Sequence, residues 1–261
     1  YGISHDGING TCPPHRSATL TVKPQLPPSF IDPAIFQKSL SGYEGNNLVQ
    51  WLCCKLDRVV VMDAVKAYQV GTTKNGRTIF WQVNSEGNAA SGHVIAYPPD
   101  DHHRIKNINP TWVHSLLQLT DEKKFNWVKY WFGEHLLGRY PTRKVAIVES
   151  EKTALVASIY LAHLDFLWLA SCGKDGLNNR DKWKALQNRT IVLYPDLSTP
   201  DDKGQTPFQQ WNNVAAEMQN CGYDVCVNTF LETHADEFER AQKWDLADFL
   251  LRRELSEFQA G

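Results

Sequence analysis

Two acidic residues each follow directly after an apolar run. Val145–Val148 precedes Glu149, and Thr190-Ile-Val-Leu-Tyr-Pro precedes Asp196. If both runs are parallel strands, their C-terminal ends share one edge of the sheet, where ligands bind in α/β proteins. We therefore expect Glu149 and Asp196 to lie close together. Paired carboxylates suit Mg²⁺ (or Mn²⁺), which takes one or two protein carboxylates and completes its shell with water and phosphate oxygens. The spacing predicts phosphoryl transfer.

Four further residues could take part in this chemistry. Lys152 falls in the first turn of the helix expected after Glu149, where anions bind, so it is either a phosphate contact or an exposed helix lysine. Asp245 and Asp248 could complete a metal shell, although Asp245 fits the N-cap of the last expected helix equally well. Lys174 lies between two glycines in a loop that could hold phosphate.

Other kinds of chemistry have little support. The chain contains neither Gly-x-Ser-x-Gly nor the phosphate-binding motif of P-loop NTPases. Its six cysteines include no Cys-x-x-Cys pair, which favours a reducing cytoplasm. His102 and His103 could bind a metal, but no carboxylate partner stands at a fixed ligand spacing.

Composition places the chain among globular proteins. It has 261 residues, of which 42% are hydrophobic and 21% charged, and this balance argues against disorder. A net charge of −2 gives no overall basic field, so any nucleic acid must meet a local patch. No apolar run is long enough to span a membrane and no secretory leader is present, so we expect a cytoplasmic protein without a membrane partner. Because the chain starts at Tyr1, we expect a fragment or a processed form.

The elements that must position the acidic residues alternate between strand and helix. Strands of a parallel sheet are expected at Val145–Val148, Phe166–Ala170, Thr190–Tyr194 and Tyr223–Phe230. Helices are expected at Glu151–Leu161, Asp181–Leu186, Phe208–Asn220 and Asp245–Phe258. This order predicts an α/β domain over residues 141–261, with a parallel sheet flanked by helices.

The N-terminal half has a different pattern. Residues 1–33 are rich in Gly and Pro and predict a linker or arm, and residues 34–140 predict a mixed α+β lobe. The lobe should contain helices after Asp32, at Asn47–Leu56 and at Asp57–Tyr68, followed by an antiparallel meander over Tyr68–Tyr97. Helices are also expected at Thr111–Leu119 and Asp121–Leu137, the second with an aromatic stripe typical of a core.

Basic residues in this lobe suggest a path for a nucleic-acid strand. Lys74, Arg77, Arg104 and Lys106 could follow the phosphate backbone while Trp81 stacks on a base. The alternative is a solvated basic edge with Trp81 in the core.

Several motifs together resemble the toprim-domain family. Val148-Glu149-Ser150, followed by a helix with Lys-x-Ala, is similar to the opening toprim motif. The glycine loop within 168–178, the segment Tyr194–Ser198 at the place of the Asp-x-Asp motif, and the acidic stretch from Asp245 follow in the family's order. Within this family the chain looks most like primase-like proteins of mobile genetic elements, which resemble bacterial-type DNA primases, and residues 76–83 resemble the β-rich lobe that precedes toprim in primases.

This resemblance implies a fold and an activity. It implies a toprim domain preceded by a primase-like lobe, and DNA replication by Mg²⁺-dependent nucleotidyl transfer on a single-stranded DNA or RNA template from nucleoside triphosphates. Glu149 and Lys152 would be catalytic, and Glu149, Asp196, Asp245 and Asp248 would hold the metal. A helicase or an upstream zinc-ribbon domain would be the partner.

One position departs from the family. Ser198 stands where the second acid of Asp-x-Asp is expected, and Asp201 and Asp202 could replace it only if their loop folds back. Two alternatives therefore stay open beside the primase-like enzyme: a toprim nuclease and a non-catalytic nucleic-acid-binding module.

Overall fold

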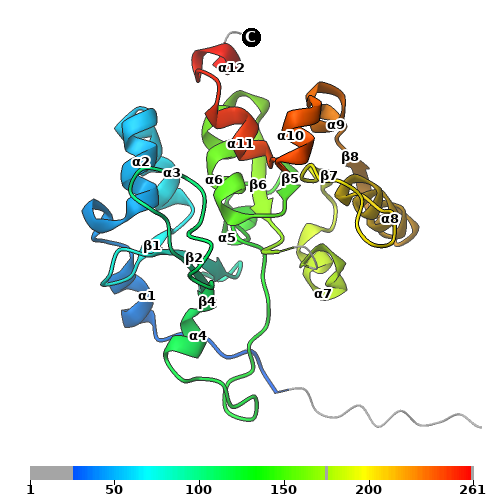
Figure 1. Ribbon diagram of the computed structural model, residues 1–261. Coiled ribbons are helices and arrows are strands. Elements are labelled where there is room, and N and C mark those ends of the chain that lie inside the picture. The colour runs from blue at the N-terminus through cyan, green and yellow to red at the C-terminus, as the bar shows by residue number, and fades with distance from the viewer. Residues whose placement is uncertain (1–25, 174–175, 260–261) are drawn as a thin grey trace, which may run out of the picture.

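The computed structural model describes residues 26–173 and 176–259, so the predicted arm 1–33 is described only from residue 26. It contains two four-stranded sheets, with strand orders β1-β2-β3-β4 and β6-β5-β7-β8 (Figure 1). The first sheet is antiparallel and the second is parallel. Within the described residues, each helix is too short or too polar to cross a bilayer.

The N-terminal lobe confirms the predicted helices and meander. Its helices are α1 (Pro33–Ser39), α2 (Asn47–Lys55) and α3 (Arg58–Ala67), and its strands are β1 (Gly71–Thr72), β2 (Thr78–Val83), β3 (Ala89–Ile95) and β4 (Thr111–Trp112). Asp32 caps α1 as expected, because its carboxylate accepts a hydrogen bond from the amide of Ala34 at 2.7 Å. Gly92 lies opposite Trp81, where a larger side chain would collide with Ile79.

The prediction of helices at Thr111–Leu119 and Asp121–Leu137 was largely wrong. The structure has only α4 (Val113–Leu116) and α5 (His135–Arg139) there. Phe132 instead forms an antiparallel bridge with Ala170, and Gly133 takes a left-handed φ of 86° that a helix does not allow. Tertiary pairing thus overrides the helical spacing, while the expected core role of the aromatic residues is confirmed by the complete burial of Trp131 and Phe132.

The C-terminal half has the predicted parallel sheet with helices around it. Its strands are β5 (Lys144–Val148), β6 (Phe166–Ala170), β7 (Thr190–Leu193) and β8 (Asp224–Val227). Its helices are α6 (Glu151–Tyr160), α7 (Arg180–Trp183), α8 (Pro207–Asn220), α9 (Phe230–His234), α10 (Glu237–Ala241), α11 (Leu246–Leu251) and α12 (Ser256–Gln259). Short 3₁₀ turns lie at Tyr43–Gly45, Ala162–Leu164, Gly176–Asn178 and Lys184–Leu186. The predicted last helix is therefore two helices, and α9 and α10 were not predicted.

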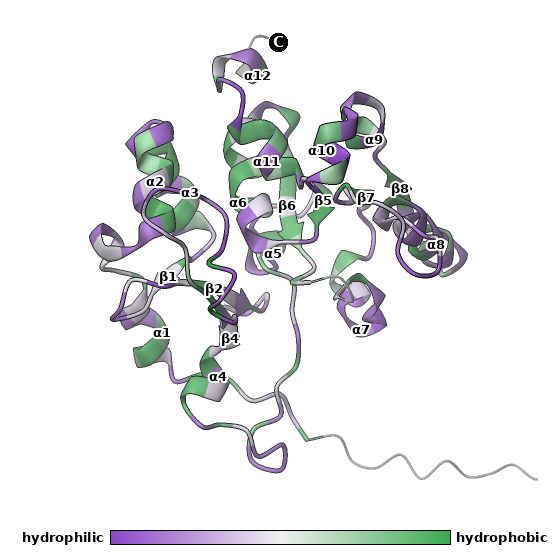
Figure 2. Cartoon of the chain, in the orientation of Figure 1, coloured by the Kyte–Doolittle hydropathy of each residue, from purple (hydrophilic) through white to green (hydrophobic). Residues whose placement is uncertain are grey.

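The hydrophobic core passes from one half of the chain into the other. Figure 2 shows β5 and β6 in hydrophobic colours at the centre, with α8 largely hydrophilic. The Tyr68 hydroxyl, at the end of α3, donates a hydrogen bond to the carbonyl of Trp168 in β6 at 2.9 Å. One core cluster includes Leu48 of α2, Phe80 of β2 and Ile147 of β5. The N-terminal lobe is thus packed directly against the sheet that carries the acidic residues.

Candidate metal and phosphate site at the edge of the parallel sheet

Glu149 and Asp196 lie beyond the C-terminal ends of neighbouring strands, as the sequence predicts. β5 and β7 pair in parallel, with Ile147 opposite Leu193. The amide of Tyr194 then donates to the carbonyl of Ile147 at 2.8 Å, which continues the pairing one step past β7. Because β5 and β7 are neighbouring parallel strands (Figure 1), Glu149 and Asp196 both follow at the same edge of the sheet.

Asp196 is the most electrostatically unusual carboxylate at this edge. Its Oδ1 is buried and has no hydrogen-bond partner within the described part of the chain. Burial, and after it the negative charges of Asp245 and Glu149, raise the pKa of Asp196 well above its ordinary value. A carboxylate in this position would be stabilised in its charged form by a cation.

Asp245 and Asp248 cap the helix that brings them to the site. The Asp245 carboxylate accepts from the amide of Asp248 at 2.8 Å, and the Asp248 carboxylate accepts from the amide of Asp245 at 3.1 Å. This capping box starts α11, so the N-cap interpretation of Asp245 is confirmed. Asp245 also accepts a hydrogen bond from the hydroxyl of Thr153 at 2.8 Å, which fixes α11 against α6.

Lys152 lies between these two carboxylates. Its Nζ is 3.1 Å from Asp248 Oδ1 and 3.3 Å from Asp245 Oδ2, and its side chain is only 9% exposed. Burial disfavours the charged ammonium, but the two carboxylates outweigh that cost and raise the pKa of Lys152. The interpretation of Lys152 as an exposed helix lysine was therefore wrong, because its ammonium is paired with Asp245 and Asp248 in the interior.

A loop of the N-terminal lobe also reaches Asp248. His102 Nε2 lies 3.1 Å and His103 Nε2 lies 3.3 Å from Asp248 Oδ1. The His102 ring packs against Trp51 of α2, with centroids 4.8 Å apart. Burial opposes the charge of Asp248, but the hydrogen bonds from the two histidines and the Lys152 ammonium lower the pKa of this carboxyl well below its ordinary value.

A second link between the halves joins β3 to α6. His93 Nδ1 lies 2.9 Å from Glu151 Oε1, and Glu151 is buried as the first residue of α6. The ring of His93 stacks on Trp112 with centroids 4.6 Å apart. Glu151 therefore joins the N-terminal lobe to the start of α6.

The glycine loop after β6 is bound to the backbone of Glu149. The amides of Cys172 and Gly173 donate to the carbonyl of Glu149 at 3.1 and 3.2 Å. Gly176 lies so close to the carbonyl of Ser171 that a side chain there would collide with it. Lys174, the predicted phosphate contact, lies outside the described residues.

Asp201 shapes the turn that follows Ser198. Asp201 accepts hydrogen bonds from the amides of Lys203 and Gln205 and from the side chain of Gln210, at 2.8 to 3.0 Å, so it organises its own turn next to α8. Asp202 is exposed.

The predicted nucleic-acid residues separate into two groups. Lys74, Arg104 and Lys106 are exposed, and Arg77 is half-buried and lines a cavity of about 230 Å³ together with Ile105, the residue between Arg104 and Lys106. Trp81, however, is completely buried, and its Nε1 donates to Ser39 Oγ at 2.9 Å. The prediction that Trp81 stacks on a base was wrong, because the ring forms part of the core.

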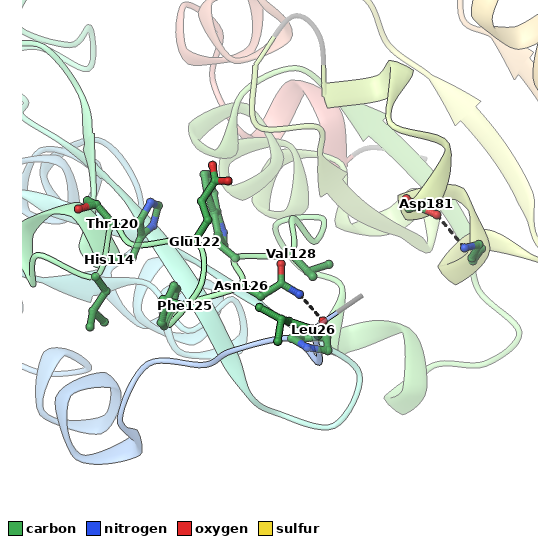
Figure 3. A pocket seen from close by; sticks show the side chains of 12 residues that line it. Leu26, His114, Thr120, Glu122, Phe125, Asn126, Val128 and Asp181 are labelled. Carbon is green, nitrogen blue, oxygen red and sulfur yellow. Dashed lines mark hydrogen bonds and ion pairs between the residues drawn. The ribbon is translucent and has the colours of Figure 1, made fainter. Parts of the chain in front are cut away.

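Other aromatic residues are available at the lobe surface. Trp112 and Trp127 are half-buried, with ring centroids 4.6 Å apart. Trp127 lines a cavity of about 840 Å³ with His114 and Phe125, and Figure 3 shows Asp181 of α7 on its opposite wall. None of the four candidate metal carboxylates lines this cavity, so it is separate from the acidic edge.

Sequence reasoning missed the contribution of histidines to the site. His93 contacts a residue 58 positions away and His102 one 146 positions away, so no local spacing could reveal these pairs. The adjacent histidines were noticed, but their carboxylate partner Asp248 could not be assigned before the two halves were placed together.

Comparison with known proteins gives one sequence family and several similar structures. No curated protein matches the sequence significantly. The structure is similar to the primase fragment of the bacteriophage T7 primase-helicase protein, with 14% identity, a TM-score of 0.46, and coverage of 80% of this chain and 78% of that chain. It is also similar to the RNA polymerase domain of Mycobacterium tuberculosis primase DnaG in complex with double-stranded DNA, with 12% identity, a TM-score of 0.47, and coverage of 87% and 75%.

A third similar structure is a DnaG primase catalytic domain bound to single-stranded DNA, with 12% identity, a TM-score of 0.44, and coverage of 86% of this chain and 80% of that chain. The family match covers residues 46–197, which is more than half of the sequence and includes Glu149 and Asp196. The chain therefore belongs to the family described as Domain of unknown function (DUF6371).

Proposed function

We propose that this chain is a primase-like toprim protein that acts on nucleic acid by Mg²⁺-dependent phosphoryl transfer. The observation that carries the proposal is the Asp196 carboxylate, whose Oδ1 is buried without a hydrogen-bond partner in the described structure and whose pKa is raised by burial and by Asp245 and Glu149. Oxygen donors from two adjacent strand ends fit Mg²⁺ or Mn²⁺, which prefer carboxylates and keep positions for water and phosphate.

The acidic residues and Lys152 have different roles in this proposal. Glu149 and Asp196 hold the cation, which neutralises charge on the reacting phosphate oxygens when bound. Asp245 adds negative charge next to Asp196. It becomes a ligand of the ion only where the ion displaces Lys152 from its carboxylate. Glu149 is also the candidate acid/base. Because Lys152 forms ion pairs with Asp245 and Asp248, its role in this proposal is to hold α11 in place.

In its full form, the proposal is nucleotidyl transfer from nucleoside triphosphates on a single-stranded DNA or RNA template. The setting would be replication of a mobile element in the cytoplasm, with a helicase or zinc-ribbon partner. The strand would cross the exposed basic residues Lys74, Arg104 and Lys106, with Arg77 beside them. A base of the strand would stack on Trp127, whose ring is half-buried. The Nζ of Lys129 lies 5.4 Å from the centroid of that ring.

Calorimetric titration with Mg²⁺ or Mn²⁺, with and without single-stranded DNA, tests the proposal. Wild type should bind the cation and Asp196→Asn should lose the binding. Asp181→Asn is the matched control, because that carboxylate is exposed and lines a separate cavity. Asp196→Asn should also be more stable than wild type without metal, because it removes a charge that burial and its neighbours disfavour. Absence of cation binding in wild type, even with DNA, would refute the catalytic proposal.

A second candidate is a nucleic-acid-binding module without catalysis, which the serine at position 198 favours. Primer synthesis and DNA cleavage assays with Mn²⁺ separate the candidates, since a toprim nuclease shortens DNA without nucleotides. A binding module would retain its DNA affinity in Glu149→Gln and would have no activity to lose.

A further inference from the structure

A cluster of two imidazoles and two carboxylates lies beside the acidic edge. Asp101, His102 and His103 each offer one ligand atom, and these atoms all lie within 4.8 Å of one another. Asp101 Oδ1 is 2.8 Å from His103 Nδ1 and 3.3 Å from His102 Nδ1. The opposite nitrogen of each ring faces Asp248 Oδ1, at 3.1 and 3.3 Å.

Asp101 and Asp248 contact opposite nitrogens of the two imidazole rings. His103 Nδ1 forms a hydrogen bond with Asp101 Oδ1 at 2.8 Å. If His102 donates its Nε2–H to Asp248, its Nδ1 carries a lone pair that faces the same oxygen of Asp101 at 3.3 Å. His102 Nδ1 is buried and has no hydrogen-bond partner among the described residues. Such an arrangement of acceptors is unfavourable unless a cation lies between them, because lone pairs on neighbouring acceptors repel.

We infer that Asp101, His102 and His103 form a binding site for a divalent transition-metal ion of the Zn²⁺ type. Imidazole nitrogens suit Zn²⁺ and related ions rather than Mg²⁺. Zinc bonds to nitrogen and oxygen of about 2.0–2.1 Å place tetrahedral ligands roughly 3.3 Å apart, close to the observed separation of Asp101 and His102. Asp248 would then act as the carboxylate that orients both ligating rings through their other nitrogen.

The cluster is open to solvent on one side and fixed on the other. The side chains of Asp101 and His103 are 48% and 53% exposed, which leaves a path for the ion and a position for water or a phosphate oxygen. His102 is held by the face of Trp51, whose Nε1 donates to the carbonyl of Asp100 at 3.1 Å. The ion would strengthen the contact between this loop and α11, because it orders the rings that bind Asp248.

Cobalt(II) and zinc titrations on the full chain test this inference. Wild type should show visible Co²⁺ absorption and X-ray absorption features of two imidazole ligands, and both should disappear in the His102→Ala/His103→Ala variant. Asp101→Asn is the variant least able to disturb folding and should weaken binding strongly, while Asp248→Asn should weaken it about tenfold to a hundredfold, as for other residues that orient metal ligands. His163→Ala is the control, because it removes an exposed histidine elsewhere and should leave binding unchanged.

The outcome is independent of the proposed Mg²⁺ site. Asp196→Asn should retain Co²⁺ and Zn²⁺ binding even if it loses Mg²⁺, so failure of either site is visible separately. Equal zinc stoichiometry and affinity in wild type, Asp101→Asn and the folded double histidine variant would overturn the inference. That result would mean that the cation between the rings and Asp101 is a proton.

Discussion

The buried ammonium of Lys152 supports both the stability and the charge balance of the site. In Lys152→Met a side chain of similar length fills the same space without a charge, so Asp245 and Asp248 face each other without their shared cation. Removing one member of a buried ion pair costs about 3–5 kcal/mol, because the remaining charge stays buried and unpaired. We expect the lower end, about 3 kcal/mol, since His102 and His103 still contact Asp248.

Urea and thermal unfolding at pH 7 measure this effect. A loss of about 3 kcal/mol should lower the melting temperature by roughly 6–12 °C in a chain of this size. Lys184→Met is the matched control, because that lysine pairs with Asp181 in solvent, with side chains 73% and 79% exposed, and should show no measurable change. The variant should also be stabilised by Mg²⁺ more than wild type, since the metal no longer competes with an internal ammonium.

If Lys152→Met lowers the free energy of unfolding no more than the control does, Lys152 is not a buried cation shared by Asp245 and Asp248. A double-mutant cycle gives the same test in another form. If Lys152 and Asp248 interact as the 3.1 Å contact indicates, the cost of Lys152→Met should fall clearly in an Asp248→Asn background. Additive losses would show that the two side chains act independently.

Two further predictions concern pH and nucleic acid. Burial raises the pKa of Glu134 to about 7, above its unfolded value of about 4.3, so the native state holds this proton more tightly and stability should fall as pH rises from about 4.3 to 7. Glu134→Gln should flatten that slope in urea unfolding between pH 5 and pH 8, and an unchanged slope would contradict the assignment. Trp127→Ala should weaken single-stranded DNA binding by about 1–3 kcal/mol in fluorescence anisotropy, as expected for one lost base stack. Trp81→Ala should instead destabilise the fold by about 3–5 kcal/mol, with the DNA affinity of the folded protein retained.

Local signals in the sequence were enough for most of the α/β half. Apolar runs ending on Glu149 and Asp196 located two adjacent strand ends, and the helix cap at Asp245 was recognisable from its residue type. The segment 121–137 was not predictable in this way, because its pairing with Ala170 in β6 depends on residues far along the chain. The same limit applies to Trp81, since only the packing of α1 on β2 decides whether that ring faces the core or the solvent.

The histidine contacts of the site depended even more on tertiary structure. His102 and His103 carry no ligand spacing of their own, and their partner Asp248 belongs to the last part of the chain. Lys152 was placed correctly at a helix start, but its burial depends on α11 lying against α6.

The core that joins the two halves has a consequence for how the chain can be divided. Tyr68 bonds to the backbone of Trp168, and Phe132 pairs with Ala170 through two backbone hydrogen bonds of 3.2 Å. A cut near residue 140 would therefore leave each fragment with an exposed apolar face and an unpaired strand edge, a state prone to aggregation. Produced together, the fragments should recombine, so the protein is suited to split reporters whose assembly restores the contacts of His102 and His103 with Asp248.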